Sequence, residues 1–498
     1  MSIVSLQVVA NLRDELRSVI DRTLVVASFA RFRRINGVAT LEPTPQQSIE
    51  AAGLNECLQR WGGIVTSLLR RYALPSPVNV DHEVKKAATY LLLQRRCRSR
   101  IIEGRWRRAF QDELTRIRLQ LEGVLDVCAK AIPAAPSASY EPIDISIELL
   151  DEANCRVTIR SAVAEAIAEM PLPVGKAEVQ SMIEAYRRPR SESAAALMPA
   201  LERYGRQLFS FIGDSVLAEA YAASCREIDS RGARRWIRLH LAKAGFLARA
   251  PWEMLHDGSG WLAVGASTVI SRAALRTRPA RSAAERPLRI VVTVSSPCDC
   301  VALGGKHEAQ VLQDALGGLR LIERAEVDVA PDGTLDTLLR MLRSAEQAGR
   351  RYDAWHFIGH GGFNAQSGAS ELAMVGRDGK AQWIGARELR VLFDRCPLRF
   401  AMLNACESGT GDFDAPAANI AGALIECGAA AVVAMQFKIS DEAAIVVADE
   451  MYGAFATGTD LLGAMTEVRR TIFCRPRGAE WITPVLILAS EWSPNVSP

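Results

Sequence analysis

One cysteine and one histidine in this sequence each stand directly after an apolar run. Cys406 follows the run from 398 to 405 and precedes the residues ESG. His360 follows the run from 353 to 359, and two glycines come after it. A thiolate is a good nucleophile, and an imidazole can take up and return a proton near neutral pH. Residues of these two types predict acyl transfer if the fold brings them together.

The segment that contains both residues alternates strand-like and helix-like patterns. Helical patterns separate five apolar runs, at about 288–295, 319–329, 353–359, 398–405 and 430–436. Such alternation predicts a mostly parallel sheet with helices on both faces. Chemistry in sheets of this kind takes place at the carboxyl ends of the strands. We therefore expect His360 and Cys406 to lie at one edge of the sheet.

The glycines after the histidine would serve the same chemistry. Gly361 and Gly362 let a substrate approach the backbone closely. A free amide of Gly361, together with that of Cys406, would hold the oxyanion that forms during acyl transfer. A single strand-end cysteine is more often a packed core residue, and a single histidine is usually structural. The joint position of the two at the ends of two strands favours catalysis.

His356 lies four residues before His360 and gives the spacing HxxxH, which can bind a metal ion. That interpretation needs a helix to bring both rings together, whereas the segment is typical of a strand. A third ligand is also missing from the pattern. We therefore expect no metal site, and a core or supporting role for His356.

Composition limits the other possibilities. The 498 residues exceed one ordinary core and predict two or three domains. Eleven cysteines without CxxC spacing favour neither a disulfide framework nor a zinc site. No apolar run reaches the roughly 18 residues of a membrane span, and the first residues lack the pattern of a secretory signal. We expect a cytoplasmic protein without a membrane partner.

Residues 1–135 differ from the rest in pattern and in charge. They hold 21 Lys and Arg against 13 Asp and Glu. Their apolar residues recur with helical spacing in four stretches, at about 5–20, 47–72, 83–100 and 105–130. A proline-containing linker follows at 131–142. We expect a helical domain at 1–135.

The densest basic stretch lies in this front domain, at 95–108, with one tryptophan among its arginines. Attraction to nucleic acid or to another acidic partner is one interpretation, and a solvated helix face is the other. We do not favour a nucleic-acid partner, because the arginines point in several directions around a helix.

The middle of the chain mixes both patterns. Strand patterns occur at about 143–149, 155–160, 233–241 and 262–271. Helical patterns occur at about 175–187 and 195–228. A second linker at 276–287, rich in arginine and alanine, separates this part from the alternating segment.

Several motifs resemble those of the CHAT domain, a caspase-like cysteine peptidase domain of the same group as separase. They are His360-Gly361-Gly362 after an apolar strand, LNACESG at 403–409, GAAAVVAM at 428–435 and ISD at 439–441. Upstream, PWEML at 251–255 and WLA at 261–263 resemble the pseudo-caspase half of the same domain. The resemblance covers about 143–490.

The resemblance implies a caspase-like α/β fold, with a pseudo-caspase half at 143–275 and an active half at 287–490, preceded by the all-α domain at 1–135. It implies a peptidase with His360 as general base and acid and Cys406 as nucleophile, using no metal or other cofactor in the chemical step. Domains of this kind are commonly effectors in prokaryotic defence or signalling that cleave protein substrates. A protein or small-ligand activator, sensed by the attached front domain, would switch the peptidase on.

The resemblance also singles out Asn404, two residues before the cysteine. In caspase-like enzymes that position lines the pocket for the residue on the amino side of the cut, and metacaspases, which cut after Lys or Arg, carry aspartate there. A neutral amide supplies no counter-charge, so we expect an uncharged residue to be preferred. Asp299, at a neighbouring strand end, would either restore an acidic pocket or cap a turn. Gly362 belongs to the expected substrate-binding surface as well.

A catalytically silent caspase-like scaffold that binds partners through its helical front is the alternative function. A scaffold needs neither His360 nor Cys406, so the presence of both favours the peptidase.

Overall fold

The computed structural model describes most of the chain after residue 138 and separate pieces before it. The described stretches are parts of 16–124, then 139–187, 194–213, 215–275, 288–300, 325–364, 369–405, 420–440, parts of 443–451, 461–474 and 478–492. Cys406, the basic stretch 95–108 and the linker 276–287 lie outside the described residues. The chain divides into two compact units, the first built mainly from 1–136 and the second from most of the remainder.

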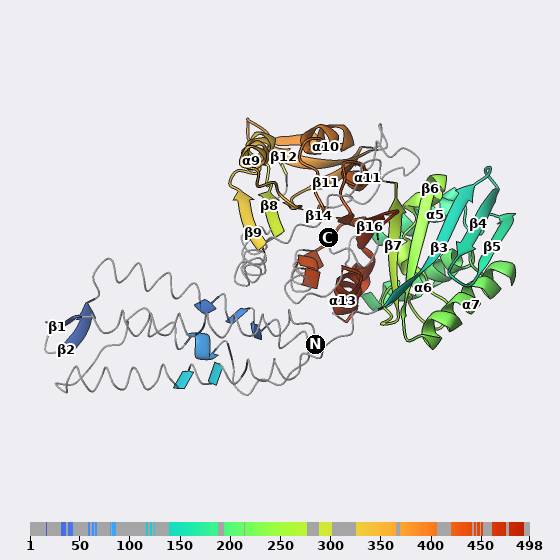
Figure 1. The fold of residues 1–498 in the computed structure, drawn as a ribbon, viewed down its shortest axis with the longest axis horizontal. Coiled ribbons are helices and arrows are strands. Elements are labelled where there is room, and N and C mark those ends of the chain that lie inside the picture. The colour runs from blue at the N-terminus through green and yellow to red at the C-terminus, as the bar shows by residue number, and fades with distance from the viewer. Residues whose placement is uncertain are drawn as a thin grey trace. The chain divides into compact units, whose positions relative to one another are not determined.

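In the first unit the described residues are helical apart from one hairpin. β1 (Arg31–Ile35) and β2 (Val38–Glu42) pair antiparallel, and Figure 1 shows them in blue. The front, which was expected to be helical throughout, therefore also contains a β-hairpin. The signal is present in the sequence, because Asn36-Gly37, a dipeptide typical of two-residue hairpin turns, stands between the strands.

The second unit is built on one sheet of eleven strands (Figure 1). They are β3 (Tyr140–Leu149), β4 (Asn154–Arg160), β5 (Glu165–Pro171), β6 (Arg234–Lys243), β7 (Thr268–Ala274), β8 (Leu288–Val294), β9 (Ala325–Ala330), β10 (Ala354–Ile358), β14 (Phe400–Asn404), β15 (Ala431–Met435) and β16 (Pro484–Ala489). Their order across the sheet is β5-β4-β3-β6-β7-β16-β15-β14-β10-β8-β9.

Most neighbouring strands of this sheet run parallel. The exceptions are β4, which is antiparallel to both of its neighbours, and the pair β15 and β16. The two parts of the sheet meet where β7 runs parallel to β16. The mostly parallel α/β class expected from the sequence is confirmed.

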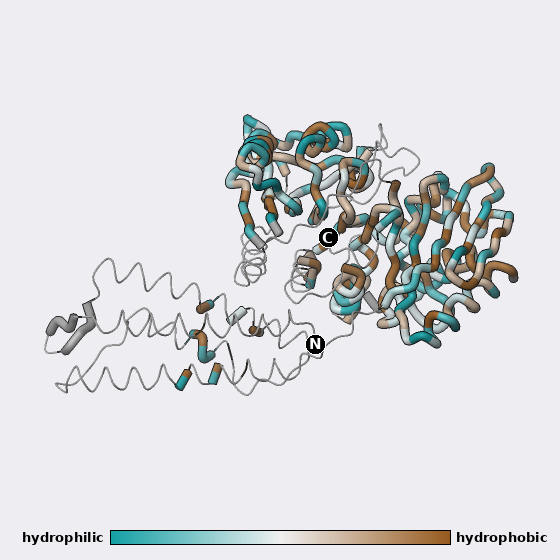
Figure 2. The backbone as a smooth tube through the Cα atoms, in the orientation of Figure 1, coloured by the Kyte–Doolittle hydropathy of each residue, from teal (hydrophilic) through white to brown (hydrophobic). Residues whose placement is uncertain are grey.

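Helices flank the sheet and explain why its strands are apolar throughout. They are α5 (Lys176–Arg187), α6 (Ala194–Phe209), α7 (Ser215–Ser230), α9 (Leu335–Gln347), α10 (Ala386–Phe393), α11 (Ile420–Glu426) and α13 (Leu461–Phe473). α7 packs on β3 to β6, α9 on β9, and α13 on β7. Every residue of β10, β14, β15 and β16 is buried, as expected for strands covered on both faces. Figure 2 shows hydrophobic segments, in brown, alternating with hydrophilic ones through the second unit.

A second, smaller sheet begins directly after His360. It is antiparallel and consists of β11 (Gly361–Asn364), β12 (Ala369–Val375) and β13 (Ala381–Ile384), in that order. No pattern in the sequence predicted this sheet. Its strands are short, and no hydrophobic alternation long enough to be recognised runs through them.

Other departures from the expected elements have local causes. The helix expected at 195–228 is two helices, α6 and α7, because the chain turns at 210–212. The strand expected at 262–271 begins only at Thr268, because residues 262–267 form turns. There the amide of Leu262 donates to the Leu255 carbonyl at 3.0 Å. The strands β5 and β16 were missed.

Candidate active site

The carboxyl ends of three parallel strands meet at one edge of the large sheet. Ile358 on β10 is the register partner of Asn404 on β14 and of Val294 on β8. The pairing continues past the strand ends, because the amide of Gly359 donates to the Asn404 carbonyl at 3.1 Å. On the other side, the amide of Ser295 donates to the Ile358 carbonyl at 2.8 Å. The two segments that follow β10 and β14 therefore begin side by side.

His360 is the next residue after this ladder ends. It is partly exposed, and its carbonyl oxygen accepts a hydrogen bond from the amide of Ala373 on β12 at 2.9 Å. The backbone of His360 is thus held between β10 on one side and the small sheet on the other. Two sheets therefore fix the position of its Cα atom.

Gly361 opens the edge strand of the small sheet, opposite Leu372. Opposed residues in an antiparallel pair alternate between hydrogen-bonded and non-hydrogen-bonded positions. Since Ala373 bonds the carbonyl of His360, the next position, Gly361, is a non-hydrogen-bonded one. The N–H of Gly361 therefore points away from β12. This is the orientation that a donor to a developing oxyanion needs.

Gly362 has a role that the sequence did not reveal. A Cβ atom at this position would lie 3.1 Å from Cζ3 and 3.3 Å from Cη2 of Trp383 on β13. The indole ring thus lies against the bare backbone of Gly362, and any larger residue would push it away. Trp383 itself is 47% exposed. Nothing in the sequence links these two residues, because the link depends on a sheet that was not predicted.

Asn404 combines burial with unsatisfied polar atoms. It is 6% exposed, and neither its Oδ1 nor its Nδ2 atom has a hydrogen-bond partner among the described residues. A buried polar group without a partner costs roughly 1–3 kcal/mol. Such a residue at the carboxyl end of a strand of a parallel α/β sheet is typical of a site that receives a ligand group.

Asp299 is exposed, and its carboxylate caps the neighbouring hairpin. Its Oδ1 atom accepts a hydrogen bond from the amide of Ala381, the first residue of β13, at 2.8 Å. The amide of Cys298 also donates to the Gly379 carbonyl at 2.9 Å. The loop that follows β8 is therefore anchored to the β12–β13 turn. The observed contact of Asp299 is therefore that of a turn cap, one of the two roles expected for it.

His356 lies inside β10 and is fully buried. Burial lowers the pKa of His356 to about 3, so its ring is neutral at physiological pH. Within the part of the chain that the structure describes, no group of His, Cys, Asp and Glu side chains could hold a metal ion.

A buried polar cluster joins the two parts of the large sheet. Arg272 on β7 donates to both carboxylate oxygens of Glu253, at 3.1 and 2.6 Å, and to Oε1 of Gln436 at 2.9 Å. The amide nitrogen of Gln436 donates to Glu253 at 2.8 Å and to the Ile482 carbonyl at 2.7 Å. Gln436 directly follows β15, the neighbour of β14. The cluster therefore ties β7 to the strand beside the candidate site.

The charges within this cluster compensate one another. Burial alone would raise the pKa of Glu253, but the charges of Arg272 and Arg469 and the hydrogen bonds from Arg272 and Gln436 together outweigh burial and hold that pKa below its usual range. Glu253 belongs to the PWEML motif. Its pairing with Arg272 explains why this motif contains a buried carboxylate. Trp252 of the same motif donates its indole N–H to the Leu247 carbonyl at 2.8 Å.

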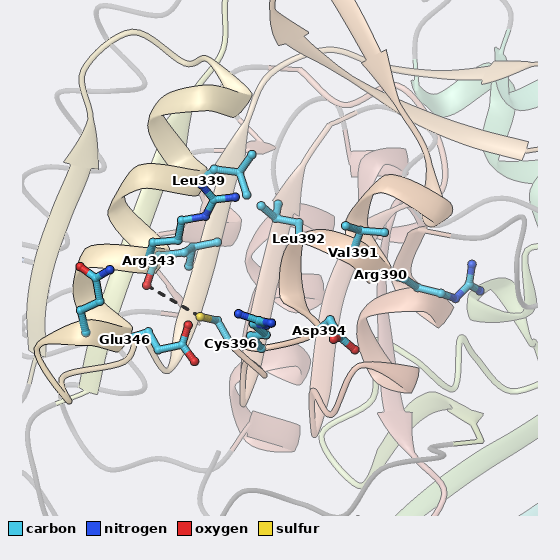
Figure 3. A pocket seen from close by; sticks show the side chains of 11 residues that line it. Leu339, Arg343, Glu346, Arg390, Val391, Leu392, Asp394 and Cys396 are labelled. Carbon is cyan, nitrogen blue, oxygen red and sulfur yellow. Dashed lines mark hydrogen bonds between the residues drawn. The ribbon is translucent and has the colours of Figure 1, made fainter.

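A large groove lies elsewhere in the second unit (Figure 3). It has a volume of about 950 Å³ and is lined by α9, α10 and the residues that follow α10. Cys396, in its wall, is buried and donates to the Leu342 carbonyl at 3.8 Å (Figure 3). Its lining includes the carboxyl ends of the two helices, which lead into the amino ends of β10 and β14. The groove is therefore at the edge opposite His360, and we do not assign the chemistry to it.

A comparison with protein families gives one match. The sequence profile of the CHAT domain matches residues 202–481, which is more than half of the chain. The chain belongs to the CHAT domain family. The caspase-like fold inferred from the sequence is confirmed by this membership and by the mostly parallel, helix-flanked sheet. The CHAT match includes both the polar cluster at Glu253 and the strand ends at His360 and Asn404.

Among solved structures, this CHAT protein is similar to separase from Saccharomyces cerevisiae, in crystal structures of the separase–securin complex. For one of them the sequence identity is 10%, the TM-score is 0.40, and the match covers 97% of this chain and 40% of the separase chain. The Drosophila initiator caspase Dronc matches with 8% identity and a TM-score of 0.29, over 44% of this chain and 92% of Dronc. This chain thus spans about two fifths of the length of separase. No curated protein matched significantly.

Among the described residues, no helix combines the length and the apolar character that crossing a membrane requires.

Proposed function

We propose that this CHAT protein is a cysteine endopeptidase with Cys406 as nucleophile and His360 as general base and acid. The observation that supports this most directly is the hydrogen bond between Gly359 and Asn404. His360 is bonded to Gly359, and Cys406 is two residues beyond Asn404. Consecutive Cα atoms are 3.8 Å apart, so chain connectivity keeps Cys406 within about 8 Å of the Asn404 Cα.

In the proposed reaction, His360 takes the proton of the Cys406 thiol and the thiolate attacks the scissile carbonyl carbon. The carbonyl oxygen becomes an oxyanion, which the amides of Gly361 and Cys406 would hold. When this intermediate collapses, His360 gives its proton to the leaving amine and a thioester remains. Water then attacks the thioester with His360 again as base, and the thiol is restored.

Asn404 is the proposed residue of the pocket that holds the substrate side chain on the amino side of the cut. Its two polar side-chain atoms have no hydrogen-bond partner in the described part of the chain, which supports this role, because a bound substrate would supply the missing hydrogen bonds. Without a charge, the amide suits an uncharged substrate residue. The substrates would be proteins, and the surroundings of Asp299 and Gly362 would border the same surface.

The resemblance to defence and signalling effectors suggests that the peptidase is switched on by a protein or small-ligand activator. The front domain, with its excess of basic residues, is the proposed sensor of that activator. The proposed bounds remain 1–135 for the front, 143–275 for the pseudo-caspase half and 287–490 for the active half.

The test is covalent labelling of the full-length chain with a biotinylated peptidyl acyloxymethyl ketone, with and without the products of neighbouring genes. We expect labelling at Cys406 that is absent in Cys406→Ala and strongly reduced in His360→Ala. Cys474→Ala is the matched control, because Cys474 is an exposed free cysteine with no proposed role. Labelling confined to exposed cysteines such as Cys298 would instead favour the catalytically silent scaffold.

A further inference from the structure

The small sheet turns one face toward solvent beside the candidate histidine. Side chains alternate between the two faces of a strand. Leu372, Met374 and Ile384 are buried on one face. On the other face Glu371 is partly exposed and Trp383 is exposed. The second face is therefore accessible to a substrate at Glu371 and Trp383, whereas Ala373 beside them is buried.

His360 and Trp383 belong to one row across this sheet. The amide of Ala373 bonds the carbonyl of His360, and Ala373 is the register partner of Trp383. Residues opposite one another in an antiparallel sheet project to the same face, and their Cα atoms are about 5 Å apart. The two Cα atoms of His360 and Trp383 are thus about 10 Å apart, with only the small Ala373 between them.

The indole ring extends from Trp383 back toward the histidine. Its six-membered ring lies over Gly362, which follows His360 by two residues in the chain. Successive residues on one face of a strand are about 6.5 Å apart. The half-exposed ring therefore forms an aromatic surface over a position about 6.5 Å, or two residues, from the proposed general base.

A carboxylate lies on the same face. Glu371 is the register partner of Gly362, and its Oε1 atom accepts a hydrogen bond from Nδ2 of Asn364 at 3.3 Å. No Lys or Arg among the described residues pairs with this carboxylate. An aromatic face with a negative charge beside it attracts a cation, and a guanidinium can also stack on the ring.

We propose that Trp383 and Glu371 form a subsite for an Arg or Lys side chain of the substrate, at one of the first two residues after the cut. This inference rests on the proposed peptidase function. His360 must reach the leaving amine to protonate it, so the residues after the cut pass closest to the histidine. The chain would thus select a neutral residue before the cut through Asn404 and a basic residue after it through Trp383 and Glu371.

The first experiment measures binding without turnover. The full-length Cys406→Ala chain is labelled with 5-fluorotryptophan, and the ¹⁹F resonance of Trp383 is identified by its loss in Trp383→Phe. We expect arginine amide to shift this resonance saturably and norleucine amide, its uncharged analogue, to leave it in place. Glu371→Gln should weaken the binding about threefold to thirtyfold, the range expected for losing an ionic partner of a cation held on an aromatic ring.

Gln382→Ala is the control variant for this titration. Gln382 is an exposed neighbour on β13 whose side chain projects to the opposite face, so its loss should leave arginine amide binding unchanged. An equal response to both amides, or binding that survives Glu371→Gln undiminished, would overturn the proposal.

The second experiment uses internally quenched peptides that differ only in the two residues after the cut. We expect Arg and Lys peptides to have a kcat/KM about threefold to thirtyfold above norleucine peptides, with the preference lost in Trp383→Ala and Glu371→Gln. Cleavage without that preference overturns the subsite and leaves the peptidase assignment intact. If no peptide is cleaved, the peptidase assignment fails, and the ¹⁹F titration still decides whether the subsite binds a cation.

Discussion

Gly359 and Asn404 are joined by a main-chain hydrogen bond of 3.1 Å that lies beyond the last register pair of β10 and β14. The bond involves no side chain of the proposed dyad. The backbone that leads toward His360 and Cys406 is therefore positioned by the sheet itself. Replacing either side chain should remove chemistry while leaving the fold nearly unchanged.

Cys406→Ala should abolish cleavage, because it removes the proposed nucleophile, and His360→Ala should slow cleavage by about a hundredfold or more. Both variants should unfold in urea at nearly the wild-type midpoint. The rates are compared on a protein substrate that the wild-type chain cleaves. Wild-type turnover in either variant would show that the dyad has been assigned to the wrong residues.

Asn404→Leu should stabilise the fold and impair cleavage at the same time. Leucine has nearly the shape of asparagine, and the exchange removes two buried polar atoms that have no described partner, so the free energy of unfolding should rise by about 1 kcal/mol. Gln436→Leu is the matched control. The Gln436 amide is bonded to Arg272, Glu253 and Ile482, so its loss should destabilise. A destabilised Asn404→Leu would mean that the asparagine is structural.

Peptide libraries should show an uncharged residue on the amino side of the cut. Asn404→Asp should redirect the preference toward Arg and Lys, because a carboxylate would then compensate a buried cation. Asp299→Asn should leave the preference unchanged, since the Asp299 carboxylate is engaged by the Ala381 amide. If wild-type protein prefers Arg or Lys and Asp299→Asn loses that preference, Asp299 is the specificity residue.

Glu253→Gln should destabilise the second unit by about 3–5 kcal/mol, because Arg272 would remain buried without a counter-charge. Glu202→Gln breaks the exposed ion pair with Arg206 and should cost no more than about 1 kcal/mol. Urea unfolding of the three proteins provides the comparison. Equal midpoints for Glu253→Gln and wild type would show that the cluster is dispensable.

His356 should make the protein sensitive to acid. The pKa of His356 is about 3 in the folded chain and about 6.5 in the unfolded chain, so between these values only the unfolded chain binds the proton. The free energy of unfolding should therefore fall as the pH decreases, by about 2 kcal/mol between pH 8 and pH 5. His356→Gln should lose less stability over this interval. The same decrease in both proteins would assign the acid sensitivity to other groups.

The sequence predicted the strands around the site because their apolar runs are unbroken, as in Phe400–Asn404. It also placed His360 at a strand end correctly. It did not predict the three-stranded sheet, whose short strands carry no clear period, and so it missed the contact of Trp383 with Gly362. It could not show that the side-chain amide of Asn404 is buried without a hydrogen-bond partner among the described residues, because such partners come from segments distant in the sequence. The position of Cys406 stays a prediction.

The place of β16 in the sheet has a consequence for the order of synthesis. This strand follows all the other described strands in the chain, yet it lies between β7 and β15 in the middle of the sheet. Until β16 and the residues before it have emerged from the ribosome, β7 and β15 each lack a neighbouring strand. The side-chain amide of Gln436 also lacks its acceptor, the Ile482 carbonyl. A nascent or prematurely terminated chain therefore cannot complete the scaffold around His360 and Cys406. The scaffold of the proposed site therefore forms only after β16 has been synthesised.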